Sequence, residues 1–393
     1  MNILHVTPFF YPAWAYGGIP RIIYGLCSEL VRQGHTVTVY TTDVLDANLR
    51  NTQLERCADV DGIRTYYFKN VSNYLAYHYN VYLPIGMRRH VKRELREFDV
   101  IQMTAHRNFL NNIVHYYSKR YSIPYVFCGE GTVLRQERRI FAKQLFDSVF
   151  GDRILNDASH FIAVSNNEVD EFERMGVNRS RVTVIPNGIN FEAFHELPET
   201  GLFRKKHGLE DQKLVLFMGR IAPIKGLDFL VRAFAECNRD DSVLVVAGPD
   251  MGARSEVDAF IAERGLDKKI MFTGLLEGED KLSAYVDADV TVSPSVYEVF
   301  GLVLFESILC GTPVIATHTC GSAESVSEQD FGRVVPYGDV PALSEKINEM
   351  LNMPIQEKTG MVARGRRHVL ENLVWPSVAA RVVRLYEHVR KHQ

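Results

Sequence analysis

The sequence has few of the features that mark membrane-spanning, zinc-binding or nucleic-acid-binding proteins. No apolar run approaches the ~20 residues of a membrane span, and no charged-then-apolar leader precedes the first expected strand. The 45 basic and 48 acidic residues give a net charge of −3, whereas a nucleic-acid binder needs a clear basic excess. The six cysteines form no C-x-x-C pair and no zinc-ligand spacing. We therefore expect a cytoplasmic protein with reduced thiols and no nucleic-acid partner.

Two common nucleotide-binding loops are also missing. The chain has neither the G-x-G-x-x-G dinucleotide fingerprint nor a Walker phosphate loop. Asp287-Ala288-Asp289 is formally a D-x-D sequence, but Asp289 leads directly into an expected buried strand. That position is the amino end of the strand, whereas ligands of parallel sheets bind outside the carboxyl ends. We interpret both aspartates as structural and predict no metal ion and no cofactor.

What the sequence does contain is a repeated alternation of short β-branched runs with longer amphipathic stretches. In 393 residues this pattern predicts two α/β domains with parallel sheets. Residues 186–208, which are rich in proline and glycine, break the rhythm and indicate the connection. We place the domains at residues 1–195 and 196–374, followed by a helix at 375–393. The expected strands are 3–9, 37–42, 63–68, 100–104, 125–128, 161–165 and 182–185, then 214–218, 243–247, 270–273, 290–293, 313–317 and 333–336.

The strongest chemical signal runs from Ser293 to Glu306. A strand ends near Ser293, a loop carries Glu298, and a helix begins near Gly301, where the backbone can approach a ligand. The N–H groups and dipole of that helix suit a phosphate. Glu306 lies about one and a half turns further along, among apolar helix neighbours. Its carboxylate needs a partner, which is either a ribose diol or an Arg or Lys elsewhere in the chain.

A second signal is the loop that contains Arg220 and Lys225. Arg220 follows a buried strand and Lys225 precedes a helix, where a cation opposes the helix dipole unless an anion is present. A guanidinium fork and a mobile ammonium together match a diphosphate. The alternative is that both are solvated loop cations.

A third and weaker signal follows the first strand. Gly17 and Gly18, with Pro20 at the start of the next helix, can bring backbone N–H groups to a phosphate or a sugar. A simple tight turn explains the same residues.

These three segments, together with 186–189 and 310–316, resemble glycosyltransferase family 4. The resemblance covers nearly the whole chain, densely over 214–336 and thinly over 45–98. It implies the GT-B fold, in which two Rossmann-like doubly wound domains face each other across a cleft and the last helix crosses back to the first domain. It also implies metal-independent, retaining transfer of a hexosyl group from a UDP- or GDP-sugar to a glycan or lipid-linked acceptor, as in polysaccharide biosynthesis.

The resemblance assigns roles to individual residues. Arg220 and Lys225 would hold the diphosphate and stabilise the leaving group. Glu298 would contact the transferred sugar and Glu306 the ribose, while Asp250 and Leu275 would lie near the base. The implied donor-binding residues are Gly17, Gly18, Arg220, Lys225, Asp250, Leu275, Glu298, Phe300, Gly301, Leu302, Val303 and Glu306.

Two further positions are catalytic candidates. Glu130 stands where many relatives have a histidine, so it is either a carboxylate that contacts the donor sugar or a salt-bridged structural residue. His106 ends another expected strand and is either an acceptor-side base or a capping or core histidine. With Arg220, Lys225 and Glu298 they complete the catalytic set that we expect.

The helical pattern over residues 84–97 carries a cluster of basic residues after several tyrosines. Such a face is either solvated or docks on an anionic membrane that carries a lipid-linked acceptor, here the inner face. The cations are Arg88, Arg89, Lys92, Arg93 and Arg96, and the tyrosines are Tyr74, Tyr77, Tyr79 and Tyr82.

Two other functions remain open for the chain as a whole. One is a nucleotide-sugar epimerase on a GT-B-type fold, which would change the sugar without an acceptor. The other is a non-catalytic subunit that binds a sugar nucleotide, which the presence of Arg220, Lys225, Glu298 and Glu306 argues against.

Overall fold

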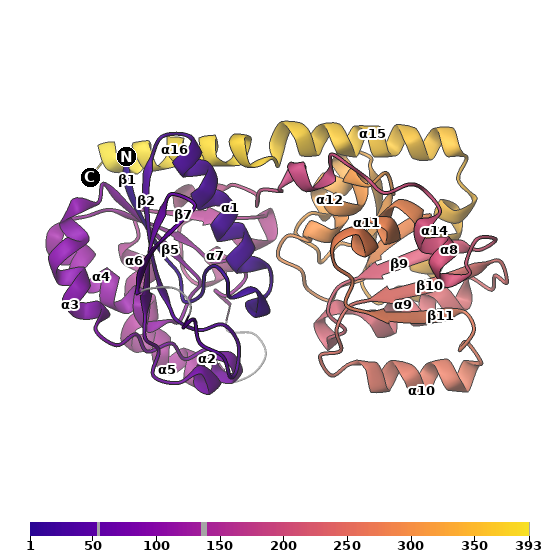
Figure 1. The fold of residues 1–393 in the computed structure, drawn as a ribbon, viewed down its shortest axis with the longest axis horizontal. Coiled ribbons are helices and arrows are strands. Elements are labelled where there is room, and N and C mark those ends of the chain that lie inside the picture. Colours follow the sequence, from indigo (N-terminus) through magenta and orange to yellow (C-terminus); the bar gives the residue numbers. More distant parts are fainter. Residues whose placement is uncertain (53–55, 135–139, 393) are drawn as a thin grey trace. The chain divides into compact units, whose positions relative to one another are not determined.

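A computed structural model of the chain describes residues 1–52, 56–134 and 140–392, which form two compact units. Unit 1 comprises Met1–Ile189 together with Leu373–Gln393, and unit 2 comprises Asn190–Asn372. Each contains a largely or wholly parallel sheet flanked by helices (Figure 1). This confirms the predicted α/β class, whereas the domain limits at 195/196 and 374/375 stay a prediction.

The sheet of unit 1 has the strand order β3-β4-β2-β1-β5-β6-β7-β8 and is parallel except for the β3–β4 hairpin. That hairpin turns through Asp61 and Gly62, both with positive φ (+52° and +82°), as a type I′ turn requires. β3 was not expected from the sequence, although Asp-Gly is a known hairpin signal. The strands are β1 Asn2–Val6, β2 Thr36–Thr42, β3 Cys57–Val60, β4 Ile63–Phe68, β5 Val100–Thr104, β6 Tyr125–Cys128, β7 His160–Ala163 and β8 Val182–Val184.

Both faces of this sheet are buried, and its central strands are mostly apolar, with buried polar exceptions such as His5 and Gln102. Ile3 belongs to one core cluster and Leu4 to the other, because successive side chains of a strand point to opposite faces. Helices α1 (Gly18–Arg32) and α16 (Trp375–Lys391) contribute to the first cluster. The helices that contribute to the second cluster are α2 Asn73–Tyr79, α3 Met87–Glu94, α4 Phe109–Tyr121, α6 Asp152–Asp157 and α7 Asn166–Arg174. Helix α5 spans Ile140–Phe146.

The sheet of unit 2 is entirely parallel, with the order β11-β10-β9-β12-β13-β14. Each strand expected in this half is present to within one residue at either end. The strands are β9 Lys213–Met218, β10 Ser242–Ala247, β11 Ile270–Gly274, β12 Val290–Ser293, β13 Val314–Thr317 and β14 Gly332–Val335. The helices are α8 Leu202–His207, α9 Leu227–Glu236, α10 Arg254–Arg264, α11 Gly278–Asp287, α12 Leu302–Leu309, α13 Ala323–Glu328, α14 Val340–Asn352 and α15 Ile355–Asn372.

Helix α16 is fixed to unit 1 through Trp375, whose ring lies against two glycines. A Cβ atom on Gly25 of α1 would lie 2.4 Å from the ring, and one on Gly188 would lie 2.3 Å from it. Further along α16, Tyr386 is buried and its hydroxyl donates to Gln102 Oε1 of β5. The last helix of the chain is therefore part of the core that contains the first strand (Figure 1).

We expect Gly25→Ala to lower the free energy of unfolding. Alanine gains roughly 1 kcal/mol over glycine within a helix, but here its Cβ enters the space of the Trp375 ring. Overpacking against a rigid ring costs about 1–3 kcal/mol. Urea titration of both proteins measures the difference.

Gly360→Ala in α15 is the matched control, because the nearest atom to its added Cβ would be 3.6 Å away. That variant should be neutral or slightly more stable. A Gly25→Ala protein stabilised as much as the control would contradict the tight contact with Trp375.

Candidate active site

The loops that follow β9 and β12 meet at the carboxyl edge of the sheet of unit 2. The two strands are neighbours, and Val296 N–H donates to the Ile224 carbonyl oxygen at 3.0 Å. Gly226, at φ +65°, lies so close to Pro294 that a Cβ would be 2.1 Å from the Pro294 carbonyl oxygen. Only glycine fits this contact. The two charged loops identified from the sequence are therefore held side by side.

Lys225 and Glu298 form an ion pair across these loops. Lys225 Nζ contacts Glu298 Oε2, and each side chain retains 20% of its exposure. The family resemblance implies that Lys225 binds the diphosphate and Glu298 the sugar. It does not predict the contact between the two side chains. Arg220 is exposed just after the end of β9. A cation and a carboxylate in contact can bind adjacent groups of one ligand.

The start of α12 is held by the segment that follows β13. Gly301 precedes the helix at φ +82°, and a Cβ there would lie 2.7 Å from Cys320 Sγ. The Phe300 carbonyl accepts a hydrogen bond from the Ser322 hydroxyl, and Gly321 N–H donates to the Glu298 carbonyl at 2.7 Å. The first N–H groups of α12, including those of Leu302 and Val303, have no acceptor within the helix. This geometry is compatible with the phosphate contact predicted for residues 300–303.

Glu306 has two partners within unit 2. Lys281 Nζ lies 2.8 Å from Oε1, and the Tyr285 hydroxyl donates to Oε2 at 2.9 Å. The alternative weighed from the sequence, a glutamate paired with a basic residue, is therefore present. The ribose contact stays a prediction, because the side chain of Glu306 keeps 21% of its exposure.

Asp250 follows β10, the neighbour of β9 on the side away from β12, and Leu275 follows β11, the strand beyond β10. Asp250 Oδ1 accepts hydrogen bonds from Gly252 N–H at 2.9 Å and Arg254 N–H at 3.3 Å, so it shapes the turn into α10. Leu275 is 63% exposed. Both lie at the same sheet edge as Arg220, as the predicted base contact requires.

Asp287 and Asp289 hold the amino edge of the sheet together. Asp287 accepts from the N–H groups of Gly201 and Arg204 at the start of α8. Asp289 contacts Arg204 Nη2 at 2.9 Å and Lys358 Nζ at 3.4 Å. Burial acts to raise the pKa of Asp289, but the Leu214 N–H and the surrounding cations outweigh it and lower the pKa. These contacts support the structural interpretation of both aspartates.

In unit 1, Gly17 and Gly18 form the entry to α1. Gly17 caps the helix at φ +91°, and Gly18 begins it. Around them, the Arg21 guanidinium lies 4.7 Å from the centre of the Trp14 ring. The paired glycines thus make a turn, and their donor contact stays a prediction.

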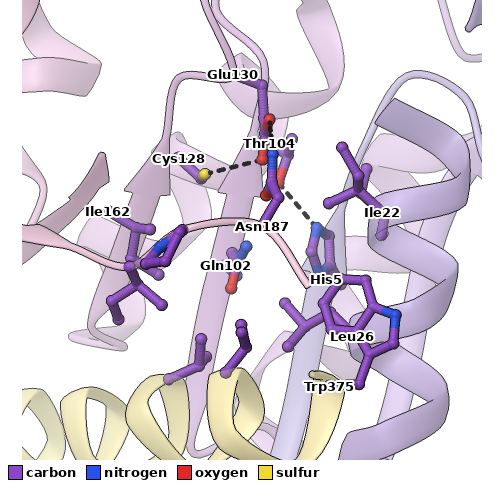
Figure 2. A pocket seen from close by; sticks show the side chains of 15 residues that line it. His5, Ile22, Leu26, Gln102, Thr104, Cys128, Glu130, Ile162, Asn187 and Trp375 are labelled. Atoms are coloured by element: carbon purple, nitrogen blue, oxygen red, sulfur yellow. Dashed lines mark hydrogen bonds between the residues drawn. The ribbon is translucent and has the colours of Figure 1, made fainter. Parts of the chain in front are cut away.

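Glu130 is held by two neutral donors, as Figure 2 shows. Asn187 Nδ2 donates to Oε2 at 3.1 Å, and the Cys128 thiol donates to Oε1 at 3.5 Å. Its partners among the described residues are thus an amide and a thiol, and its contact with the donor sugar stays a prediction. Glu130, Asn187 and Cys128 line a cavity of about 30 Å³, which has room for about one water molecule. Burial raises the pKa of Glu130 despite the hydrogen bonds from Asn187 and Cys128.

A second carboxylate, Glu168, lies directly behind this loop. It is buried and accepts hydrogen bonds from Gly131 N–H at 2.7 Å and Val164 N–H at 2.8 Å. Burial and then the charge of Glu130 raise the pKa of Glu168 to about 8. Its own N–H donates to the Ser165 hydroxyl, which caps α7. Glu168 thus fixes the backbone on which Glu130 stands.

His106 lies in the core rather than on the surface. Its side chain has 0% exposure, and Nε2 lies 3.3 Å from Asp147 Oδ1. Burial lowers the pKa of His106, although Asp147 acts in the opposite direction. Because an acceptor in solution does not reach a fully buried ring, the structure favours the core histidine over the acceptor-side base.

The basic face predicted for residues 88–96 is exposed on α3 and the turn that follows it. Among the preceding tyrosines, Tyr74 and Tyr79 are exposed whereas Tyr82 is buried in the core. In the part of the chain that the structure describes, no helix combines the length and apolarity needed to cross a membrane.

Comparison with known protein families decides the relationship of the chain. Residues 16–193 match the family described as Glycosyltransferase Family 4, and residues 200–368 match the one described as Glycosyl transferases group 1. The chain belongs to glycosyltransferase family 4. The two matches span most of both units.

Relatives of this family 4 glycosyltransferase differ in how much of their length aligns. An uncharacterised glycosyltransferase of Methanocaldococcus jannaschii is 27% identical, and the alignment covers 98% of each chain. A D-inositol 3-phosphate glycosyltransferase of Salinispora tropica is 28% identical over 62% of this chain and 54% of its own. A GDP-mannose-dependent alpha-(1-6)-phosphatidylinositol monomannoside mannosyltransferase of Mycolicibacterium smegmatis is 28% identical over 59% and 63%. The chain thus spans only part of the length of these two relatives.

Solved structures confirm the GT-B fold. HepE of Anabaena in complex with UDP has a TM-score of 0.79 and 20% identity, covering 99% of this chain and 100% of its own. Sucrose-phosphate synthase from Thermosynechococcus elongatus has a TM-score of 0.74 and 21% identity, covering 100% of each chain. At such identities the likeness establishes the fold alone.

Three residues of these sites were not singled out from the sequence of the glycosyltransferase. Lys281 and Tyr285 contact Glu306, and Asn187 contacts Glu130. Asn187 lies in a Pro-Asn-Gly segment that had been interpreted only as a linker and a family resemblance. The spacing of Lys281 and Tyr285, four residues apart on a helical pattern, was the one available signal.

We expect Asp289→Asn to destabilise unit 2 by about 1–3 kcal/mol at neutral pH, the typical loss for a buried charged acceptor. The pKa of Asp289 is lowered in the folded state, so its contribution is complete above the unfolded pKa of about 3.9 and is lost as the pH falls through the folded value. The difference between the two proteins should therefore shrink in acid. Urea unfolding at several pH values measures it.

Asp240→Asn is the matched control, since the side chain of Asp240 is 99% exposed and pairs only with Lys269 at the surface. Its effect should stay within about 0.5 kcal/mol. An Asp289→Asn effect independent of pH would show that the carboxylate charge is not what stabilises the amino edge.

Proposed function

We propose that the chain transfers a hexosyl group from a UDP- or GDP-sugar to a glycan or lipid-linked acceptor, with retention of configuration and without a metal ion. The observation that carries the proposal is the gathering of Arg220, Lys225, Glu298 and the start of α12 at one sheet edge. HepE, which shares the fold, was solved with UDP, and one relative is named as GDP-mannose-dependent.

The chemistry of the proposed step is the stabilisation of a leaving diphosphate. Negative charge grows on the diphosphate as the glycosyl bond breaks, and fixed cations lower the barrier most when they act on that charge. Arg220 and Lys225 supply the cations, and the N–H groups ahead of α12 supply further donors. We propose a front-face mechanism, in which the acceptor hydroxyl attacks the sugar from the side that the diphosphate leaves. The departing phosphate oxygen takes the acceptor proton.

Metal independence is proposed because the carboxylates that would chelate an ion have other roles. Asp287 and Asp289 bind the start of α8 and the cations around it at the amino edge. The charge of the diphosphate is therefore left to Arg220 and Lys225. Glu130, at the position of the family histidine, is proposed to contact hydroxyls of the transferred sugar.

The basic face of α3 supports a second proposal, that the protein binds peripherally to an anionic membrane from the cytoplasmic side. Its five cations are exposed, and the exposed Val71, Tyr74, Leu75, Tyr79 and Ile85 precede them. Cations next to aromatic and aliphatic side chains are typical of an interfacial surface. Sedimentation with vesicles that contain or lack anionic lipid tests this contact.

We expect Lys225→Ala and Arg220→Ala to lower turnover by about 10²–10³-fold while affecting donor affinity much less, since the charge they neutralise is greatest in the transition state. Steady-state kinetics at saturating donor measures turnover, and calorimetric titration with the nucleotide measures affinity. Lys268→Ala is the control, because Lys268 is exposed just before β11, at the amino edge of the sheet. Unchanged turnover with weakened binding would show that both cations only anchor the donor.

We expect transfer to survive EDTA and the product to keep the anomeric configuration of the donor. A thermal-shift screen with UDP-, GDP- and ADP-sugars identifies the donor, because a bound ligand raises the melting temperature. Proton NMR of the product formed with a panel of glycan and lipid-linked acceptors then gives the anomer. An inverted product or loss of activity in EDTA would refute the proposed chemistry.

Two controls separate this proposal from its alternatives. Incubation with the donor alone changes the sugar only if the protein is an epimerase. Absence of turnover with the donor and every acceptor of the panel indicates a binding subunit. Glu130→Gln should keep the rate within about tenfold, as expected for a residue that accepts hydrogen bonds rather than forming a bond. A glycosyl adduct on Glu130 in the mass spectrum would instead indicate double displacement.

A further inference from the structure

Lys281 and Tyr285 hold both oxygens of the Glu306 carboxylate. They lie four residues apart on α11, so their side chains project from the same face of that helix. Lys281 Nζ is 2.8 Å from Glu306 Oε1, and the Tyr285 hydroxyl is 2.9 Å from Oε2. Glu306 itself lies on α12, so the contact joins two helices of unit 2.

The environment of Tyr285 keeps its hydroxyl protonated. Tyr285 is fully buried, and burial followed by the charge of Glu306 raises its pKa well above the usual value. Its backbone is also fixed, because the Thr312 hydroxyl donates to the Tyr285 carbonyl at 2.6 Å. At neutral pH Tyr285 therefore remains protonated and donates its O–H to Glu306.

The same arrangement leaves part of the carboxylate available. An ionised carboxylate offers about four acceptor positions. Lys281 Nζ, which also lies 2.8 Å from Oε2, and the Tyr285 hydroxyl take up part of them. The side chain of Glu306 keeps 21% of its exposure. The remaining acceptor positions match two hydroxyl donors in a fixed relation to each other, such as the 2′ and 3′ hydroxyls of a ribose.

We propose that Lys281 and Tyr285 are positioning residues that orient Glu306 toward a ribose diol and so set the preference of the site for ribonucleotides over deoxyribonucleotides. This inference rests on the proposed function, since it requires that unit 2 binds a nucleotide. Lys281 places a positive charge 2.8 Å from both oxygens, and Tyr285 adds a hydrogen bond to Oε2. Without either of them the carboxylate is free to rotate away from the diol.

The test compares the dissociation constants of UDP, GDP and ADP with those of their 2′,3′-dideoxy forms by calorimetry. The natural sequence should prefer the ribonucleotide by about 10–100-fold, the value of hydrogen bonds to a charged acceptor. Lys281→Met and Tyr285→Phe should reduce the preference to about threefold or less, while the affinity for the dideoxy form stays the same. Lys281→Arg should restore most of it.

Asp280→Asn on the same helix is the matched control, because Asp280 points to Lys206 at the surface. Melting temperatures establish that each variant is folded. Variants that keep the full ribose preference would overturn the positioning role. Equal affinity of the natural sequence for both sugar forms would overturn the ribose contact of Glu306 and this proposal, but not the transferase function. Absence of binding to every nucleotide tested would overturn the proposed function as well.

Discussion

The backbone contact between Gly226 and the Pro294 carbonyl is the constraint on which the loops at the carboxyl edge of the sheet of unit 2 depend. A similar approach ties the next pair of loops, since a Cβ on Gly248 would lie 1.8 Å from the Gly219 carbonyl oxygen. The loops after β9, β10 and β12 therefore have little freedom to move apart. Their charged side chains project from fixed points, which is what catalysis by positioned charges requires.

The buried carboxylates of the two units differ in the donors that stabilise them. Asp289 is surrounded by cations and its pKa is lowered. The donors to Glu130 and Glu168 that the structure describes are neutral, and the pKa values of both are raised. Glu306 combines both kinds of donor, one ammonium and one hydroxyl. The charge of the neighbouring donors thus decides whether they overcome the effect of burial on the pKa of the carboxyl group.

Much of the fold could be predicted because its strands are buried on both faces and so are rich in apolar and β-branched residues. The edge strand β3 was not predicted because Cys57–Val60 is only partly buried and includes Asp59, so it forms no apolar run. Partners of the site residues were not predictable in the same way. Lys281 is 25 residues from Glu306, and Asn187 is 57 residues from Glu130. Those contacts depend on how helices and loops pack, which local patterns do not specify.

The packing of Trp375 between Gly25 and Gly188 has a consequence for the order in which the two units fold during synthesis. Domains generally fold during synthesis from the amino terminus onward. Here the core of unit 1 includes α16, whose residues follow the whole of unit 2 in the chain. On the ribosome, unit 2 can complete its core first, while the apolar surface of α1 that receives Trp375 waits uncovered. The core of unit 1 is therefore completed only after α16 has been made and released from the ribosome.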